Sequence, residues 1–400
     1  MAGAVRKAKL RHLIFSGLLI VALVEVYSVL PARRLKVSRQ PKHASGAIHV
    51  SAGDLGPVRA RQLAKAAARA GLDFVIFADL DRTLESTALP GDEGVDLFSE
   101  IEVPTPAGHA LYFYSHTDLA GSTPKRLREL AWKHYLGGES VGGSFLVVAH
   151  PASLFKPWER LDRYSEGVEL INLKSQLEQQ MLNRPLSFAV AFALAPLNSY
   201  LALMHLYDFP EREIQAWDAS HPVSPGHFGI VGSDESSQMP WLDKAGLTLP
   251  PTELALGAAS NAIILDAPLA KTATERQTQI YQALKEGRSA MVLHAIHPFE
   301  GNDWFVQCGE KQYRVGARFP WSQGCEMHVE TPPGLGHKRI VFVRDGQKIA
   351  ERTAAKPSET LALEGPGVYR VEVWVRQTSL LRLALNREAP YLMYNPLYVR

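Results

Sequence analysis

Short apolar runs alternate with helical patterns along the first three quarters of the chain. The runs are rich in β-branched and aromatic side chains, which is typical of buried strands. Residues 57–71, 123–137 and 274–287 instead repeat apolar positions at helical spacing. Strands that alternate with helices predict a mostly parallel sheet, open or closed. The predicted strands cover residues 47–50, 73–80, 109–115, 144–150, 167–173, 229–234 and 261–267.

The pattern changes near Gly301. From there to Arg400, short apolar runs are separated by Gly, Pro and Asp turns, and no long helical period is present. About a hundred residues of this kind predict a small antiparallel, Ig-like sandwich. The sequence therefore divides into an α/β unit over residues 47–300 and an all-β unit over residues 301–400.

The N-terminal region predicts a membrane anchor. Residues 13–30 form an apolar run interrupted by one acid, Glu25, and the basic residues of the tail 1–12 precede it. No small-x-small cleavage signature follows, so an uncleaved transmembrane signal anchor is favoured over a removed signal peptide. Residues 31–46 are basic and polar and are interpreted as a linker. This arrangement predicts a membrane-anchored, extracytoplasmic (periplasm-facing) protein.

A second apolar stretch covers residues 186–207. Pro196, Asn198 and His205 interrupt it, and it lies within domain-like sequence. A buried helix or a pair of helices is therefore favoured over a second membrane span.

Composition narrows the classes of partner. The formal net charge is +2, which gives no electrostatic reason to expect nucleic acid as a partner. Cys308 and Cys325 are the two cysteines. Two thiols cannot complete a structural zinc site, which usually takes four ligands. A disulfide and a pair of reduced core thiols both remain open.

Residues able to bind a metal fall at or near the ends of the predicted strands. Imidazoles and carboxylates gathered at one mouth of a parallel scaffold are the ligands that a hard or borderline divalent cation requires. A lone histidine at a strand end is more often a structural, hydrogen-bonded residue, so the weight lies in the order of the set. The candidate metal ligands are His49, Asp79, Glu102, His109, His150 and Asp234. Two further histidines, His221 and His227, precede the last of these and form a weaker hypothesis as substitute ligands.

The order IHV, GLDFVIFAD, EIEV, GHAL, VVAHP, GVELIN and GSD resembles the PHP (polymerase and histidinol phosphatase) superfamily. The resemblance covers residues 47–295, and the ending PYLMYNPLYV is similar to a C-terminal sandwich found on some exported members. It implies a distorted (β/α)7, TIM-like barrel that binds up to three zinc, manganese or iron ions and hydrolyses phosphoesters.

Three positions depart from the motifs of this family. Ser51, Leu80 and Ser236 stand where its members carry histidine. By the resemblance, one metal position keeps Glu102, His109 and His150. A second position keeps His49, Glu102 and Asp234 but lacks one histidine, and a third has lost its ligands. One or two divalent ions are therefore expected.

These observations predict a metal-dependent phosphoesterase with a reduced metal site, weakly active or vestigial. The alternative is a catalytically inactive binding or scaffold protein of the cell envelope, with glycan binding by the sandwich as a further option. The expected partners are the membrane, through the N-terminal helix, and a phosphoester or cell-envelope ligand.

Overall fold

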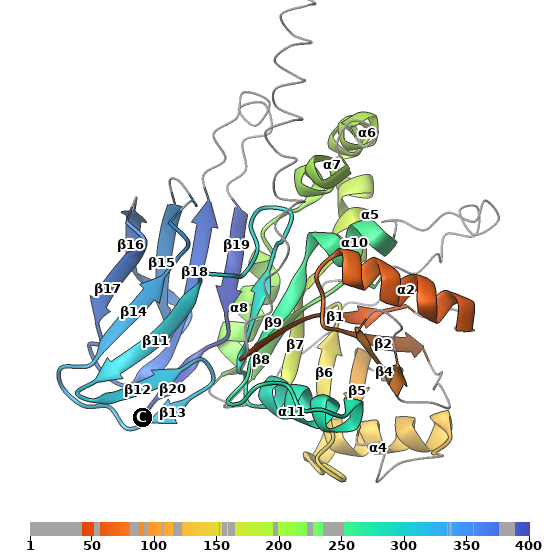
Figure 1. Cartoon of the computed structure of the whole chain (residues 1–400), viewed down its shortest axis with the longest axis horizontal. Coiled ribbons are helices and arrows are strands. Elements are labelled where there is room, and N and C mark those ends of the chain that lie inside the picture. The colour runs from red at the N-terminus through yellow and green to blue at the C-terminus, as the bar shows by residue number, and fades with distance from the viewer. Residues whose placement is uncertain are drawn as a thin grey trace, which may run out of the picture.

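The computed structural model describes most of the chain from Lys42 onward (Figure 1). The described residues are 42–51, 57–80, 88–90, 94–105, 107–114, 122–151, 153, 158, 165–194, 199–221, 227–234, 252–333, 335, 338–354, 356–375 and 389–400.

Seven strands close into a barrel. Each pairs with the next in the order β1-β2-β4-β5-β6-β7-β8, and β8 pairs with β1 through Ile48 and Gly232. The apolar side chains of these strands fill the barrel and the layer between its wall and the covering helices. The strands are β1 (His43–Val50), β2 (Phe74–Leu80), β4 (Asp96–Thr105), β5 (Gly108–Phe113), β6 (Phe145–Ala149), β7 (Gly167–Asn172) and β8 (Phe228–Gly232).

One strand of the barrel runs against the others. β5 is antiparallel to both β4 and β6, whereas the remaining neighbours in the ring are parallel. A tight turn between Thr105 and Gly108 joins β4 to β5. A short strand, β3 (Ala88–Pro90), pairs with the first three residues of β4, Asp96 to Phe98.

The helices begin and end at residues suited to those positions. Thr123 caps α4 and Pro124 starts it, while Gly138 ends it in the left-handed conformation. Thr272 and Glu275 form a capping box at the start of α11. The helices are α2 (Pro57–Arg69), α4 (Pro124–Gly137), α5 (Leu173–Asn183), α6 (Pro185–Leu194), α7 (Ser199–Leu206), α8 (Glu211–Ser220), α10 (Thr252–Ala258) and α11 (Ala273–Lys285).

The C-terminal strands form two layers around a common apolar core that includes Trp304 and Tyr391. One layer is continuous with the barrel, because β9 pairs with β1, β10 pairs with β9, and β19 pairs with β10. That layer contains β9 (Ser260–Ile264), β10 (Ser289–Val292), β13 (Arg318–Phe319), β15 (Lys338–Arg344), β16 (Gln347–Ala354), β18 (Gly367–Val375), β19 (Ala389–Tyr394) and β20 (Leu397–Val399). The other layer contains β11 (Asp303–Cys308), β12 (Lys311–Arg314), β14 (Glu326–Glu330) and β17 (Ser358–Ala362).

The predicted α/β architecture is wrong. Over its described residues the chain is mostly β, with eight helices, and its barrel is a closed β-barrel rather than a PHP-type (β/α)7 or TIM-like barrel. Antiparallel neighbours such as β4 and β5 need only a tight turn and no crossover helix, so the expected alternation breaks there. The Ig-like sandwich is not self-contained either, since one of its layers continues into the barrel through β9 and β10.

The membrane anchor is corrected as well. No helix among the described residues is long and apolar enough to cross a bilayer. The predicted span, residues 13–30, lies outside the described residues together with the tail 1–12, and the last residues of the predicted linker 31–46 belong to β1. The transmembrane signal anchor, and the extracytoplasmic location that depended on it, therefore find no support in the described part of the chain. Of the buried helix or helical pair predicted over residues 186–207, the pair is confirmed as α6 and α7, but α6 is largely exposed rather than buried.

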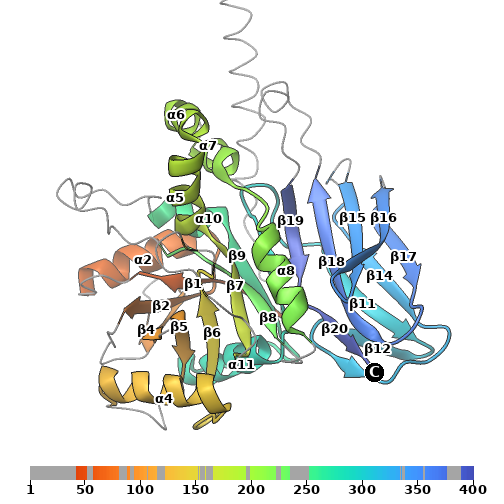
Figure 2. The same cartoon turned by 180° about the vertical axis from the view of Figure 1, so that it is seen from behind.

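The helix α8 lies between the barrel and the C-terminal strands (Figure 2). The guanidinium of Arg370 in β18 donates to the carboxylate of Asp218 in α8 at 2.9 and 3.0 Å. Beside this pair, His227 is buried with its ring nitrogens 2.5 Å from Ser220 Oγ and 3.1 Å from Ser165 Oγ. Burial, assisted by the nearby Arg370, lowers the pKa of His221 to about 4, and burial beside His221 lowers that of His227 to about 4.

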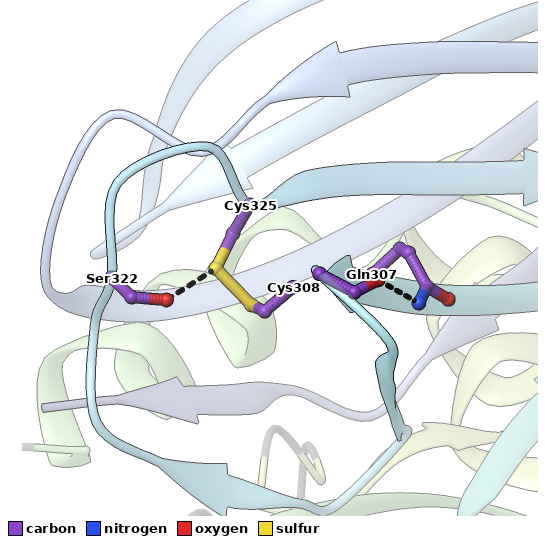
Figure 3. Close-up of a disulfide and its surroundings, with 5 residues drawn as sticks. Gln307, Cys308, Ser322 and Cys325 are labelled. Carbon is purple, nitrogen blue, oxygen red and sulfur yellow. Dashed lines mark hydrogen bonds between the residues drawn. A yellow bond between two sulfur atoms is a disulfide. The ribbon is translucent and has the colours of Figure 1, made fainter.

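The structure joins Cys308 and Cys325 in a disulfide (Figure 3). The bond links the end of β11 to the residue before β14 and closes a loop across a sequence separation of 17 residues. Cys325 Sγ also lies 3.1 Å from Ser322 Oγ. Of the two alternatives that the sequence left open, the disulfide is therefore the one observed.

Removing this disulfide should destabilise the C-terminal layers. Loop-closure entropy for a loop of this length predicts that Cys308→Ser with Cys325→Ser lowers the free energy of unfolding by about 3 kcal/mol. Urea denaturation of the oxidised protein and of the double variant measures the difference. As a control, dithiothreitol should lower the midpoint of the wild type and leave that of the variant unchanged. An equal midpoint for all samples would show that the bond does not constrain the unfolded chain.

The buried histidines beside α8 should make stability depend on pH. The unfolded chain binds protons at these rings below its pKa of about 6.5, whereas the folded chain does not until about pH 4, so stability falls with pH between these values. Each ring lowers the free energy of unfolding by on the order of 3 kcal/mol as the pH falls from about 6.5 to about 4. Denaturation at several pH values should show a shallower loss in His221→Gln and in His227→Asn than in the wild type. A matched change at the partly exposed His328 should leave the slope as it is, and equal slopes in all four proteins would refute the assignment.

Candidate metal centre

The side chain of Glu102 lies at the centre of a histidine cluster at one mouth of the barrel. Its Oε1 atom is 2.7 Å from His109 Nδ1 and 3.0 Å from His150 Nε2. Its Oε2 atom faces His49 Nε2 at 3.6 Å. Three strands bring these groups together: Glu102 lies near the end of β4, His109 near the start of the reversed β5, and His150 directly after β6.

The ligand atoms of Glu102, His109 and His150 all lie within 4.8 Å of one another. Two nitrogens and a carboxylate oxygen at that separation form a donor set that zinc, manganese or iron accepts. His150 Nδ1 and His49 Nε2 are buried and make no hydrogen bond within the described part of the chain. A buried imidazole nitrogen without a partner is costly, and metal coordination is one way to satisfy it. The residues therefore fit a divalent cation.

A second group of side chains adjoins the first. His49 Nε2 lies 3.9 Å from Asp234 Oδ1, and the amide of Asn172 donates to the other oxygen of Asp234 at 3.3 Å. Lys174 Nζ approaches that same oxygen at 3.7 Å. Asn172 also caps α5 by accepting from the backbone N–H of Ser175. The N-terminus of α5 is thereby fixed beside the cluster.

The carboxylate of Glu169 supports two histidines of the cluster, His49 and His150. Its carboxylate lies 2.9 Å from His49 Nδ1 and accepts the backbone N–H of His150 at 2.6 Å. Gly232 in β8 makes this approach possible, since a β-carbon there would lie 1.6 Å from Glu169 Oε1. Trp158 acts similarly on the other side, where its indole N–H donates to the carbonyl of His109 at 2.8 Å. Such supporting contacts orient metal ligands.

Backbone strain is concentrated at this mouth. Among the described residues, four non-glycine residues adopt positive φ, and three of them belong to the cluster: His49 (55°), His150 (30°) and Asp234 (42°). Non-glycine residues in this region cost on the order of 1–3 kcal/mol each. The conformation occurs just where each strand ends and turns the side chain into the mouth. Strain of this kind is typical of functional sites.

Charge in the cluster is strongly coupled. Burial raises the pKa of a carboxylic acid, but hydrogen bonds from His109 and His150, together with the nearby His49, outweigh it and hold the pKa of Glu102 well below its usual value. Burial likewise opposes protonation of His49, yet Glu169, Asp234 and Glu102 raise its pKa well above normal. The pKa of Asp234 is raised, chiefly by burial. The site thus favours positive charge among its carboxylates, which a cation can also supply.

Five of the six predicted ligands converge here: His49, Glu102, His109, His150 and Asp234. The backbone of Asp79 lies near the end of β2, paired with Ile101, and its side chain lies outside the described set. His221 and His227 are in the contact with the C-terminal strands instead, so they do not replace missing ligands. The sequence placed Glu169 among the polar residues of the predicted strands but not among the metal ligands, and it gave no role to Lys174 or Trp158. Glu169 was visible as a polar residue in an apolar strand, whereas nothing in the pattern marked the other two.

Loss of one ligand should abolish tight binding of a metal. His150→Gln should weaken zinc or manganese affinity by more than the roughly 100-fold penalty typical of losing a supporting contact, because it removes a ligand itself. Titration calorimetry on protein stripped with a chelator measures the affinity. The control is His134→Gln, which breaks a partly buried His–Glu pair between α4 and Glu166 (2.9 Å), away from the cluster. Equal affinities in the two variants would show that the histidine cluster is not a metal centre.

Comparison with known proteins adds no independent assignment. No protein-family model, curated protein or solved structure matches this chain. The resemblance to the PHP superfamily consequently stays a prediction from motifs. Function has to be argued from the geometry of the site.

Proposed function

We propose that this chain is a metal-dependent phosphoesterase that works with a reduced metal site. The observation that carries the proposal is the shared approach of Glu102, His109 and His150 to within 4.8 Å at a strained barrel mouth. A divalent ion bound there would lower the pKa of a bound water and neutralise charge on a phosphoryl oxygen. The order of these residues along the chain is also that of the metal-binding motifs in which the sequence resembles the PHP superfamily.

The protein's own groups suit an anionic substrate. The ammonium of Lys174 lies beside Asp234 at the N-terminus of α5. A lysine and the first N–H groups of a helix are both favourable to a phosphoryl oxygen. Glu169 keeps the His49 ring in place, and Gly232 keeps room for that carboxylate. Lys174 and the N-terminus of α5 would bind and orient the ester, Glu169 would orient His49, and the metal ligands would hold the ion.

A second candidate function is binding without turnover. Leu80 ends β2 at a position where the resemblance expects a metal-binding histidine, and its side chain is 40% exposed. An apolar residue there cannot ligate, and a site short of one ion loses part of the charge stabilisation that phosphoester hydrolysis needs. The alternative is therefore a metal-bearing barrel that binds a phosphoester or cell-envelope ligand. Glycan binding by the C-terminal strands stays a prediction.

Hydrolysis of model esters separates these two functions. The full chain supplied with zinc, manganese or iron should hydrolyse p-nitrophenyl phosphate or its bis ester. Glu102→Gln should lower kcat/KM at least 100-fold, about 2.7 kcal/mol of transition-state stabilisation, because the carboxylate joins two of the histidines. His134→Gln should retain activity. Bound metal without turnover would establish the binding function, and absence of bound metal would exclude both.

A further inference from the structure

Two of the three helices after β7, α5 and α6, carry large apolar side chains into solvent. Leu182 at the end of α5 is 59% exposed, and Leu186 and Val190 in α6 are 83% and 46% exposed. Among the described residues, eight large apolar side chains are exposed, and these three fall within nine consecutive positions. Leu186 and Val190 are four residues apart and so share one face of α6. We call Leu182, Leu186 and Val190 the apolar tip.

The apolar tip belongs to a part of the molecule that projects from the barrel. Both views show α6 and α7 standing out beyond α5, on the side away from α4 (Figures 1 and 2). The inner face of this helical group has its own small core, in which Ala191 packs with Leu177 and Leu206. The fold of the three helices therefore does not require the outward leucines, which leaves their exposure to be explained.

The character of α6 distinguishes between possible occupants. Residues 185–204 include no charged side chain, and the ion pair of Arg184 with Asp208 (3.1 Å) stands at the edge of that stretch. A helix that docks in a protein groove is amphipathic, whereas one that is apolar on every face belongs in an apolar medium. A stable interface between two proteins also takes about 20–30 residues a side with a polar rim, far more than this tip offers.

We propose that the apolar tip inserts into the surface of a lipid layer. Leucine and valine side chains enter the acyl region favourably, and a helix as short as α6 can dip into one leaflet without spanning the bilayer. The contact is peripheral, requires no transmembrane helix and does not depend on the metal centre. The cap of α5, Asn172, lies beside Asp234, and the helix rises about 16 Å from there to the end that carries Leu182.

A fluorescent probe at the tip tests this contact directly. Both native cysteines are in the disulfide, so a single introduced cysteine can be labelled with an environment-sensitive dye. The full chain carrying Leu186→Cys, and separately Val190→Cys, is added to phosphatidylcholine vesicles with brominated acyl chains. The matched control is Leu136→Cys, a 44% exposed leucine in α4 at the other end of the barrel unit.

The proposal expects a blue shift and strong quenching by the brominated chains at positions 186 and 190, and neither at position 136. Vesicle-bound protein with unquenched probes at the tip would overturn it, as would failure to bind vesicles. A probe at position 186 that is already shielded without lipid would also overturn it. Shielding that grows with protein concentration would identify a second copy as the occupant, and constant shielding would identify another segment of the same chain.

Discussion

The buried carboxylate of Glu102 is the group on which the arrangement of the barrel mouth depends. A desolvated carboxylate needs compensation, and His109 and His150 supply it at 2.7 and 3.0 Å while His49 faces it at 3.6 Å. These histidines come from three different strands, so the carboxylate draws β1, β5 and β6 to one point. A divalent ion held by Glu102, His109 and His150 would also compensate the carboxylate charge. Without this carboxylate, the three imidazoles would lose the negative charge that they share.

The backbone conformation at the barrel mouth costs folding stability. His49, His150 and Asp234 adopt a left-handed backbone conformation that glycine would adopt without strain. The surrounding structure maintains it through contacts made far along the chain, such as the carboxylate of Glu169 against the His49 ring and the His150 backbone. Gly232 admits that carboxylate, and Trp158 fixes the turn that presents His109. These contacts offset the cost of the strained backbone and keep the side chains of His49, His150 and Asp234 close together.

The helix α5 connects the candidate metal centre to the exposed apolar tip. Its first turn lies beside Asp234 and Lys174, and its last residues reach the exposed leucines that continue into α6. At the other side of the barrel, the shared sheet and the Arg370–Asp218 pair tie the C-terminal strands to α8. The C-terminal layers are therefore tied to the unit that carries the metal centre through both the sheet and α8.

The sequence by itself determined where most strands lie and which polar residues stand at their ends, because burial of alternate or consecutive apolar residues is a local signal. It also predicted a helix or a pair of helices over residues 186–207, and the structure shows two, α6 and α7. Tertiary structure decided the reversal of β5, the closure of β8 on β1 and the mostly β character of the chain. It also decided that α6 is exposed and that Glu169 supports His49 across 120 positions. Periodicity reports that a face is buried but not which neighbour buries it, so contacts between distant segments cannot be read from a local pattern.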